Sequence, residues 1–182
     1  SAGLAAKDLK KRFNLPETSN FTGVTEIKGK LSLAPFDVLE VTSDFKGLAL
    51  NTPLPWSKSA TEERAFYMGL DFSTDELPLN IQLADQLDFL MHINQLHRGS
   101  HLQIAEQTVV KAILPEQPGL AISLNLEQLN AEPLYKWAKQ IFNMQASSKN
   151  TDINTATDKL QDLSKVNINI GDLSWDDFEL GK

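Results

Sequence analysis

The feature that most constrains this chain is an alternation of apolar and polar residues with a period of two. In the stretch 66–72, Phe66, Met68, Leu70 and Phe72 occupy every second position. Side chains of a β-strand point alternately to its two faces, so this spacing predicts a strand with one apolar face. Further segments repeat the pattern, and we predict strands within 25–33, 39–46, 48–50, 77–83, 87–93, 101–106, 110–114, 120–126 and 166–182.

The fold class follows from this repetition. We predict a mainly β protein built as a curled antiparallel sheet, shaped like a β-groove or taco, with one or two packed α-helices. The alternation changes phase at Gly47, because Leu48 and Leu50 fall on the parity that was polar in the preceding strand. A glycine at such a switch is typical of a bulge or a sharp change of strand direction.

Two segments depart from the period of two. Ala5, Leu9 and Phe13 are spaced four apart, as in a short amphipathic helix, and Pro133 suits the first turn of a second helix that should pack on the sheet. The stretch after this second helix is polar and lacks a sustained period. The predicted organisation is a helix over 1–16, a β-rich domain over 17–145 with helix 132–144, a polar linker or short helix over 146–165, and a last strand of the same domain over 166–182.

Composition excludes several functional classes. The 182 residues carry 17 basic and 24 acidic side chains, a net charge of -7, with no basic stripe that would neutralise phosphates. We therefore expect no nucleic-acid partner. There is no cysteine, which excludes disulfides and thiolate chemistry. No run approaches the roughly 18 apolar residues of a membrane span, so we expect the segment to be soluble as written.

The search for catalytic chemistry is negative. His92, His97 and His101 lie close in sequence. His97 and His101 could bind one metal ion only if this segment were helical, and Gly99 between them favours a turn instead. We therefore expect solvated loop histidines. Adjacent carboxylates such as Asp176 and Asp177 would point to opposite faces of a strand. No nucleophile elbow, phosphate loop or zinc-binding helix motif is present. We expect no enzyme activity, no metal and no cofactor.

The abundant alternating apolar residues leave two alternatives open. They form either the closed core of a sandwich or curled sheet, or the lining of an open apolar groove. Both arrangements need one apolar face, so periodicity does not separate them.

The run from Ser43 to Leu48 reads S-D-F-K-G-L, and the run from Pro53 to Lys58 reads P-L-P-W-S-K. These two runs resemble the "SDLxG" stretch and the "LPxPLxK" loop of YhdP-type proteins, which belong to the AsmA-like superfamily of Gram-negative bacteria. The run 124–129 and the closing V-x-I-x-I-G-x-L strand also resemble the family pattern. Trp56 stands where a smaller aliphatic residue is usual, and the segment 146–164 matches no part of the pattern.

The resemblance implies a function. AsmA-like proteins are inner-membrane-anchored periplasmic bridges whose apolar concave surface carries phospholipid acyl chains towards the outer membrane. This chain would be a soluble internal periplasmic segment of such a bridge, with acyl chains and the rest of the full-length chain as partners. The lipid-groove candidates are Leu48, Leu50, Phe66, Met68, Leu70 and Phe72. The predicted rim loop consists of Pro53, Pro55, Trp56 and Lys58. Its prolines would brace the rim of the groove, because proline protects an exposed strand edge and fixes the loop. The alternative function is a non-catalytic envelope scaffold or protein-interaction β-domain with a closed core.

Overall fold

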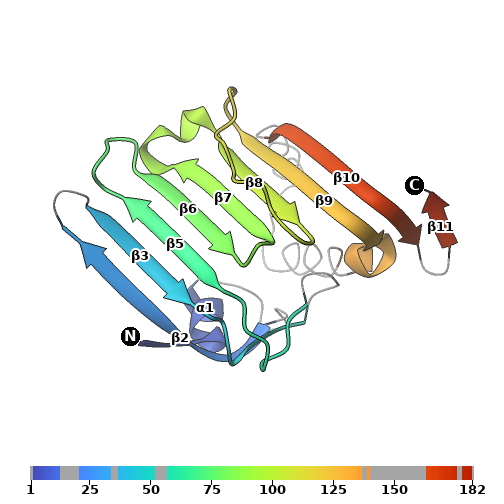
Figure 1. Ribbon diagram of the computed structural model, residues 1–182, viewed down its shortest axis with the longest axis horizontal. Helices are drawn as coiled ribbons and strands as arrows, with labels where there is room; N and C mark the ends of the chain where they lie inside the picture. Colours follow the sequence, from blue (N-terminus) through green and yellow to red (C-terminus); the bar gives the residue numbers. More distant parts are fainter. Residues whose placement is uncertain are drawn as a thin grey trace, which may run out of the picture.

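The protein is built around a single open β-sheet in the computed structural model (Figure 1). The structure describes residues 2–12, 21–33, 37–51, 57–136, 139, 163–175 and 178–181. Within these residues the strands are β1 (Ala2–Ala5), β2 (Phe21–Ser32), β3 (Val38–Ser43), β4 (Leu48–Leu50), β5 (Phe66–Asp71), β6 (Pro78–Leu83), β7 (Leu87–His92), β8 (Ser100–Ala105), β9 (Leu120–Asn130), β10 (Leu163–Trp175) and β11 (Phe178–Gly181).

The strands follow the order β1-β2-β3-β5-β6-β7-β8-β9-β10-β11, and β4 pairs with β2 beside this path. Every pair from β1 to β8 along it is antiparallel. β8, β9 and β10 are parallel to one another, and β11 returns antiparallel to β10. The predicted mainly β fold is therefore confirmed as an open sheet, which is mixed because parallel strands enter through the long connections before β9 and β10.

A corner forms where β2 changes partners. Residues 21–23 of β2 pair with β4, whereas residues 28–32 pair with β3. The backbone of Gly23 has a φ of 103° and that of Gly47 a φ of 87°, values that favour glycine. The amide of Val24 donates to the Gly47 carbonyl at 3.2 Å. The change of strand direction predicted at Gly47 is therefore present, and it takes β4 away from the main strand order.

The helices and termini differ in detail from the prediction. The predicted helix over 1–16 is shorter: β1 comes first and pairs with β2, and α1 (Ala6–Arg12) follows. The chain is helical over 131–136, near the start of the predicted helix 132–144. Of the predicted linker 146–165, residues 146–162 lie outside the described residues, and residues 163–165 belong to β10. The single predicted C-terminal strand is two strands, β10 and β11.

The predicted strand over 110–114 is absent. These residues lie in the connection 106–119, which we call the crossover and which joins the parallel strands β8 and β9. Val110, Ala112 and Leu114 alternate as a strand would, but Val110 and Ile113 are 71% and 72% exposed, so apolar side chains on both faces of this segment lie in solvent. The backbone groups of this segment bond to side chains and loops of the sheet rather than to a neighbouring strand, which explains why the alternation was misleading. A short 3₁₀ segment, η1 (Ile93–Arg98), links β7 to β8.

Candidate functional site

The period-two alternation places apolar side chains from seven neighbouring strands on one face of the sheet. Strand register shows this directly: Met68 of β5 is opposite Val41 of β3 and Ile81 of β6. The same row continues through β7, β8, β9 and β10. We call this surface the apolar face, and its members are Leu39, Val41, Phe66, Met68, Leu70, Leu79, Ile81, Leu83, Leu87, Phe89, Met91, Leu102, Ile104, Ile122, Leu124, Val166 and Ile168.

Charged residues do not interrupt the apolar face across the described strands. The rows above and below the Met68 row contain serines at Ser43 and Ser100, and their other members from β3 to β9 are aliphatic or aromatic. Phe66, which follows Ser43 in its row, stacks on Phe45 with ring centroids 4.8 Å apart. The result is a continuous apolar surface that extends across the strands.

The side chains of the apolar face are not packed as a closed core. Those from β3 to β9 are all partly buried, and Val166 and Ile168 of β10 are 49% and 62% exposed. Fully buried apolar side chains are few among the described residues; they are Ala6, Leu48, Ala105, Ala112, Ala121, Leu126 and Leu129. Of these only Leu126, the position after Leu124 on the same face of β9, adjoins the apolar face. Core side chains of a closed domain are usually fully buried by many neighbours.

The opposite face of the sheet is polar and carries the crossover. Asp88 of β7 is 2% exposed, and its carboxylate accepts from Asn80 Nδ2 at 2.7 Å and from the amide of Ala112 at 3.2 Å. His101 of β8 lies nearby, with its Nδ1 2.7 Å from the Ile113 carbonyl oxygen and its Nε2 3.1 Å from Ser123 Oγ. These contacts fix the crossover to the polar face, so it does not cover the apolar face.

His101 also corrects the prediction of solvated loop histidines. It is a partly buried residue of β8 with both ring nitrogens in hydrogen-bonding contact, and its period-two position gave the only sequence signal for this. Within the described residues no group of three or more potential ligands is arranged to hold a metal ion.

The predicted groove residues lie in two different places. Phe66, Met68 and Leu70 belong to the apolar face, and Phe72, just beyond β5, has a 44% exposed side chain. Leu48 and Leu50 lie on β4, away from the main strand order, and Leu48 is 5% exposed. The members of the face on β6 to β10 were not among the predicted groove candidates, although their alternation was visible, because periodicity does not tell which strands are neighbours.

Of the predicted rim loop, Pro53, Pro55 and Trp56 lie outside the described residues, and Lys58 is buried. The Lys58 side chain is 2% exposed, and its Nζ donates to the carbonyls of Leu48 at 2.7 Å and Ser59 at 2.9 Å. Its backbone also forms a two-way bridge with Leu50. Burial lowers the pKa of Lys58 below the ordinary lysine value. Lys58 thus connects β4 to the segment that follows the loop.

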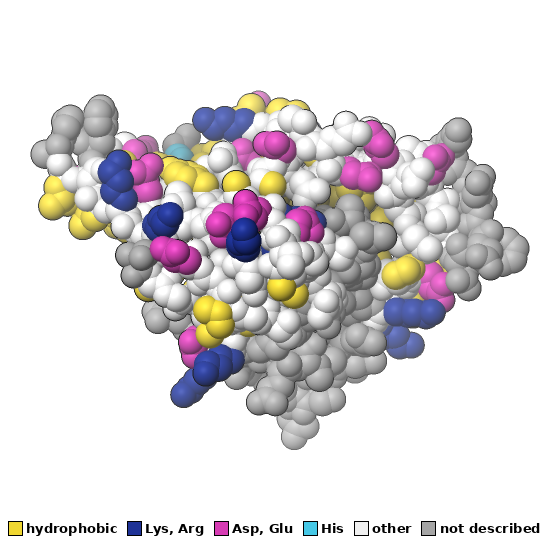
Figure 2. Space-filling view, turned by 60° about the horizontal axis from the view of Figure 1, so that its bottom comes forward, with side chains coloured by type: hydrophobic (Ala, Val, Ile, Leu, Met, Phe, Trp, Pro, Cys, Tyr) yellow, Lys and Arg dark blue, Asp and Glu magenta, His cyan; other side chains and the backbone are white. Residues whose placement is uncertain are grey.

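Charges on the surface are mixed. Figure 2 shows basic and acidic side chains interspersed on the visible side rather than gathered in a field of one sign. Several form exposed pairs, including Lys30 with Glu40 at 3.3 Å and Lys46 with Glu63 at 2.7 Å. The Glu63 carboxylate raises the pKa of Lys46. None of the described helices is long and apolar enough to cross a membrane.

Comparison with known proteins gives one family. The model of the YhdP family, described as YhdP protein, matches residues 1–181. Neither the curated proteins nor the solved structures gave a match. The resemblance to YhdP-type proteins, predicted from the motifs around Gly47 and Lys58, is therefore confirmed.

Proposed function

Since this chain belongs to the YhdP family, we propose that it is a periplasmic segment of an inner-membrane-anchored, AsmA-like bridge that carries phospholipid towards the outer membrane. The acyl chains would lie on the apolar face. Membership of the AsmA-like superfamily is consistent with the family match. In this proposal the segment works together with the rest of the full-length chain and makes or breaks no covalent bond.

The observation that carries the proposal is the continuity and partial exposure of the apolar face. It extends over seven strands, which at a strand spacing of about 4.8 Å corresponds to a width of about 29 Å. The hydrocarbon of one bilayer leaflet is about 15 Å thick, half of the roughly 30 Å core. An acyl chain therefore fits on this surface with room to move along it.

The physical basis of the proposed transport is simple. Each methylene moved from water to an apolar surface gains about 0.8 kcal/mol, so a chain of a dozen or so carbons is held without any specific contact. Because the rows of the face contain similar aliphatic side chains, neighbouring positions bind a methylene about equally well. A surface of this kind retains the chain and still allows it to slide, while the headgroup stays in water.

The alternative, a scaffold with a closed core, differs in what covers the apolar face. In a closed core Met68 would be tightly packed, and a charged side chain at this position would unfold the domain. The partial exposure of Met68, Ile81 and Phe89 supports the open groove instead.

Aspartate substitutions on the two faces test the proposal. Met68→Asp and Ile168→Asp place a carboxylate on the apolar face, and Thr42→Asp places one at an exposed position on the opposite face of β3 as the matched control. We expect both apolar-face variants to reduce co-purified or added phospholipid, measured by native mass spectrometry, about tenfold relative to Thr42→Asp, with melting temperatures near that of the parent protein.

The same substitutions in the full-length protein should impair the outer-membrane barrier, measured by sensitivity to large antibiotics, whereas Thr42→Asp should not. Because Ile168 is exposed, Ile168→Asp is expected to fold even if Met68→Asp does not. A folded Ile168→Asp protein that binds phospholipid as well as the parent, together with an unfolded Met68→Asp protein, would establish the closed-core scaffold and exclude the groove.

A further inference from the structure

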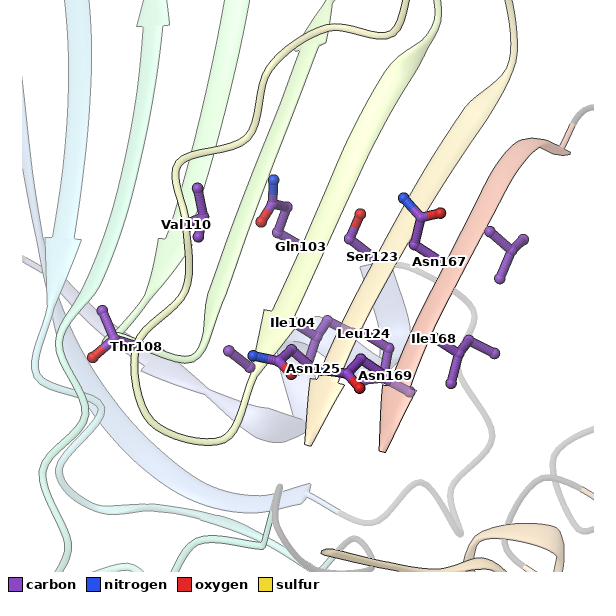
Figure 3. Close-up of a pocket in the computed structure, with 12 residues that line it drawn as sticks. Gln103, Ile104, Thr108, Val110, Ser123, Leu124, Asn125, Asn167, Ile168 and Asn169 are labelled. Atoms are coloured by element: carbon purple, nitrogen blue, oxygen red, sulfur yellow. Dashed lines mark hydrogen bonds between the residues drawn. The ribbon is translucent and has the colours of Figure 1, made fainter. Parts of the chain in front are cut away.

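The polar face holds a second concave feature, which the proposed lipid function does not use. A hollow of about 470 Å³ lies between the crossover and the strands β8, β9 and β10 (Figure 3). Its polar side chains are all amides or hydroxyls and include those of Gln103, Ser123, Asn125, Asn167 and Asn169, with Val110 of the crossover at the opposite side.

Strand register arranges these polar side chains in two rows. Gln103, Ser123 and Asn167 are cross-strand partners on β8, β9 and β10. Asn125 and Asn169 form the next row, two residues further along the parallel strands. In Figure 3 the side chains of Gln103, Ser123 and Asn167 project to the same side of the sheet. The floor of the hollow is therefore a regular grid of hydrogen-bonding groups.

Gln103 Nε2 donates to the Lys111 carbonyl at 3.5 Å, and Ser123 Oγ lies 3.1 Å from His101 Nε2, so these two side chains are partly used within the protein. The asparagines leave more of their hydrogen-bonding capacity for a ligand. Asn169 Nδ2 donates to Asn125 Oδ1 at 2.9 Å, which leaves the amide nitrogen of Asn125 and the amide oxygen of Asn169 unused by that bond. The side chain of Asn167 is exposed and has no hydrogen-bond partner among the described residues, whereas its backbone belongs to the β9–β10 pairing. Each amide offers a donor and an acceptor side by side.

The chemistry of the lining selects a class of ligand. None of the described residues that line the hollow carries a charge, so a phosphate or carboxylate group gains no ionic contact there. Amide groups match ligands that present neighbouring donors and acceptors, as the hydroxyl groups of a sugar ring do. Val110, 71% exposed, offers an apolar surface for the C–H side of such a ring. The volume lies within the usual range of about 300–1,000 Å³ for small-ligand sites.

We propose that this hollow is a binding site for a neutral oligosaccharide. Ile104, Leu124, Val166 and Ile168 of the apolar face also line the hollow, but the amide side chains that define the site alternate with them and lie on the opposite side of the same strands. The proposal therefore does not depend on lipid transport, and either can fail without the other.

The test is a titration of the ¹⁵N-labelled 182-residue chain with two neutral probes, maltotriose and tri-N-acetylchitotriose, followed by NMR. We expect at least one probe to shift the side-chain amide signals of Asn125, Asn167 and Asn169 in a saturable way, with a Kd of about 1 mM. The variant Asn167→Ala should weaken this binding about tenfold, because it removes a donor and an acceptor that contact the sugar. Gln128→Ala, on β9 but outside the hollow, is the matched control and should bind like the parent.

Three results would overturn the proposal. One is the absence of saturable shifts with both probes up to about 30 mM, well above the expected Kd. Another is unchanged binding by an Asn167→Ala protein whose melting temperature equals that of the parent. The third is an equal response to the uncharged peptide acetyl-tetraalanine-amide, which would identify the hollow as a peptide site. Phospholipid capture by Asn167→Ala should remain at the parent level, since the lipid face is not altered.

Discussion

Gly23 and Gly47 cross so closely that neither position has room for a side chain. A Cβ atom on Gly23 would lie 2.0 Å from the Gly47 carbonyl oxygen, and a Cβ on Gly47 would lie 2.2 Å from the Val24 carbonyl oxygen. Both residues also have positive φ values. The corner between β2 and β4 therefore requires glycine on both sides.

We expect Gly23→Ala and Gly47→Ala each to lower the free energy of unfolding by about 2–4 kcal/mol, because the backbones must separate and the positive φ is strained. Urea denaturation followed by circular dichroism measures the change. Gly29→Ala is the matched control on the same strand, since a Cβ there has nothing within 4 Å. Equal effects of Gly23→Ala and Gly29→Ala would show that the corner is not tightly packed.

The buried carboxylate of Asp88 should be essential for holding the crossover. In Asp88→Ala, the amide of Ala112 loses its acceptor and Asn80 Nδ2 keeps only the Phe89 carbonyl at 3.2 Å. An unsatisfied buried donor costs about 1–3 kcal/mol. We expect a loss of stability in this range and faster hydrogen exchange of the crossover amides. Asp85→Ala, an exposed position in the β6–β7 turn, is the control and should change stability by less than about 0.5 kcal/mol. Unaltered exchange at Ala112 in Asp88→Ala would contradict the assigned role.

Lys58 should make stability depend on pH in the alkaline range. Burial lowers its pKa in the folded protein, so between that lowered pKa and the ordinary lysine value of about 10.4 the unfolded chain binds more protons. The contribution of Lys58 to stability therefore rises with pH in this window and is lowest below it. We expect the parent protein to gain stability relative to Lys58→Met as the pH is raised towards about 10.4.

Chemical denaturation of the parent and Lys58→Met at several alkaline pH values measures this difference. Lys28→Met, which removes one charge from an exposed position of β2, controls for the change in net charge. A stability difference between the parent and Lys58→Met that stays constant with pH would show that Lys58 is not desolvated.

The stacked rings of Phe45 and Phe66 should stabilise the end of the apolar face. Their centroids are 4.8 Å apart and the ring planes differ by 15°. A double-mutant cycle with Phe45→Leu and Phe66→Leu should give a coupling energy of about 0.5–1.5 kcal/mol, as for other aromatic pairs. A coupling energy near zero would indicate that the two rings do not stack in solution.

The sequence pattern predicts strands better than it predicts their partners. Alternation identified the strands that carry Val41, Met68, Ile81 and Ile122, because a half-exposed strand needs that period. The same alternation from Val110 to Leu114 was misleading, since Asp88 and His101, which are distant in sequence, bind the backbone of that segment. Parallel and antiparallel strands share the period of two, so the direction of β9 and β10 was not predictable from it.

The candidate site was predictable in the same limited way. The alternation of Phe66, Met68 and Leu70 predicts that they share one face of one strand, whereas joining them to Phe89 or Leu102 needs the register of the whole sheet. The burial of Lys58 had no local signal, because its acceptor on Leu48 is ten residues away and belongs to another strand. The amides of Asn125 and Asn169 are 44 residues apart and meet only through the parallel pairing of β9 and β10.

That separation has a consequence for how the molecule assembles. Among the antiparallel strands β5 to β8, residues that contact each other are close in sequence, so only short loops have to close. Asn80 and Asp88, for example, are eight residues apart. The pairing of β9 with β10 must close a much longer loop, which costs more chain entropy before any contact compensates for it. The antiparallel strands β5 to β8 should therefore form first, and β10 should join an existing template late in folding. Its amides are then expected to be the first of the sheet to exchange with solvent.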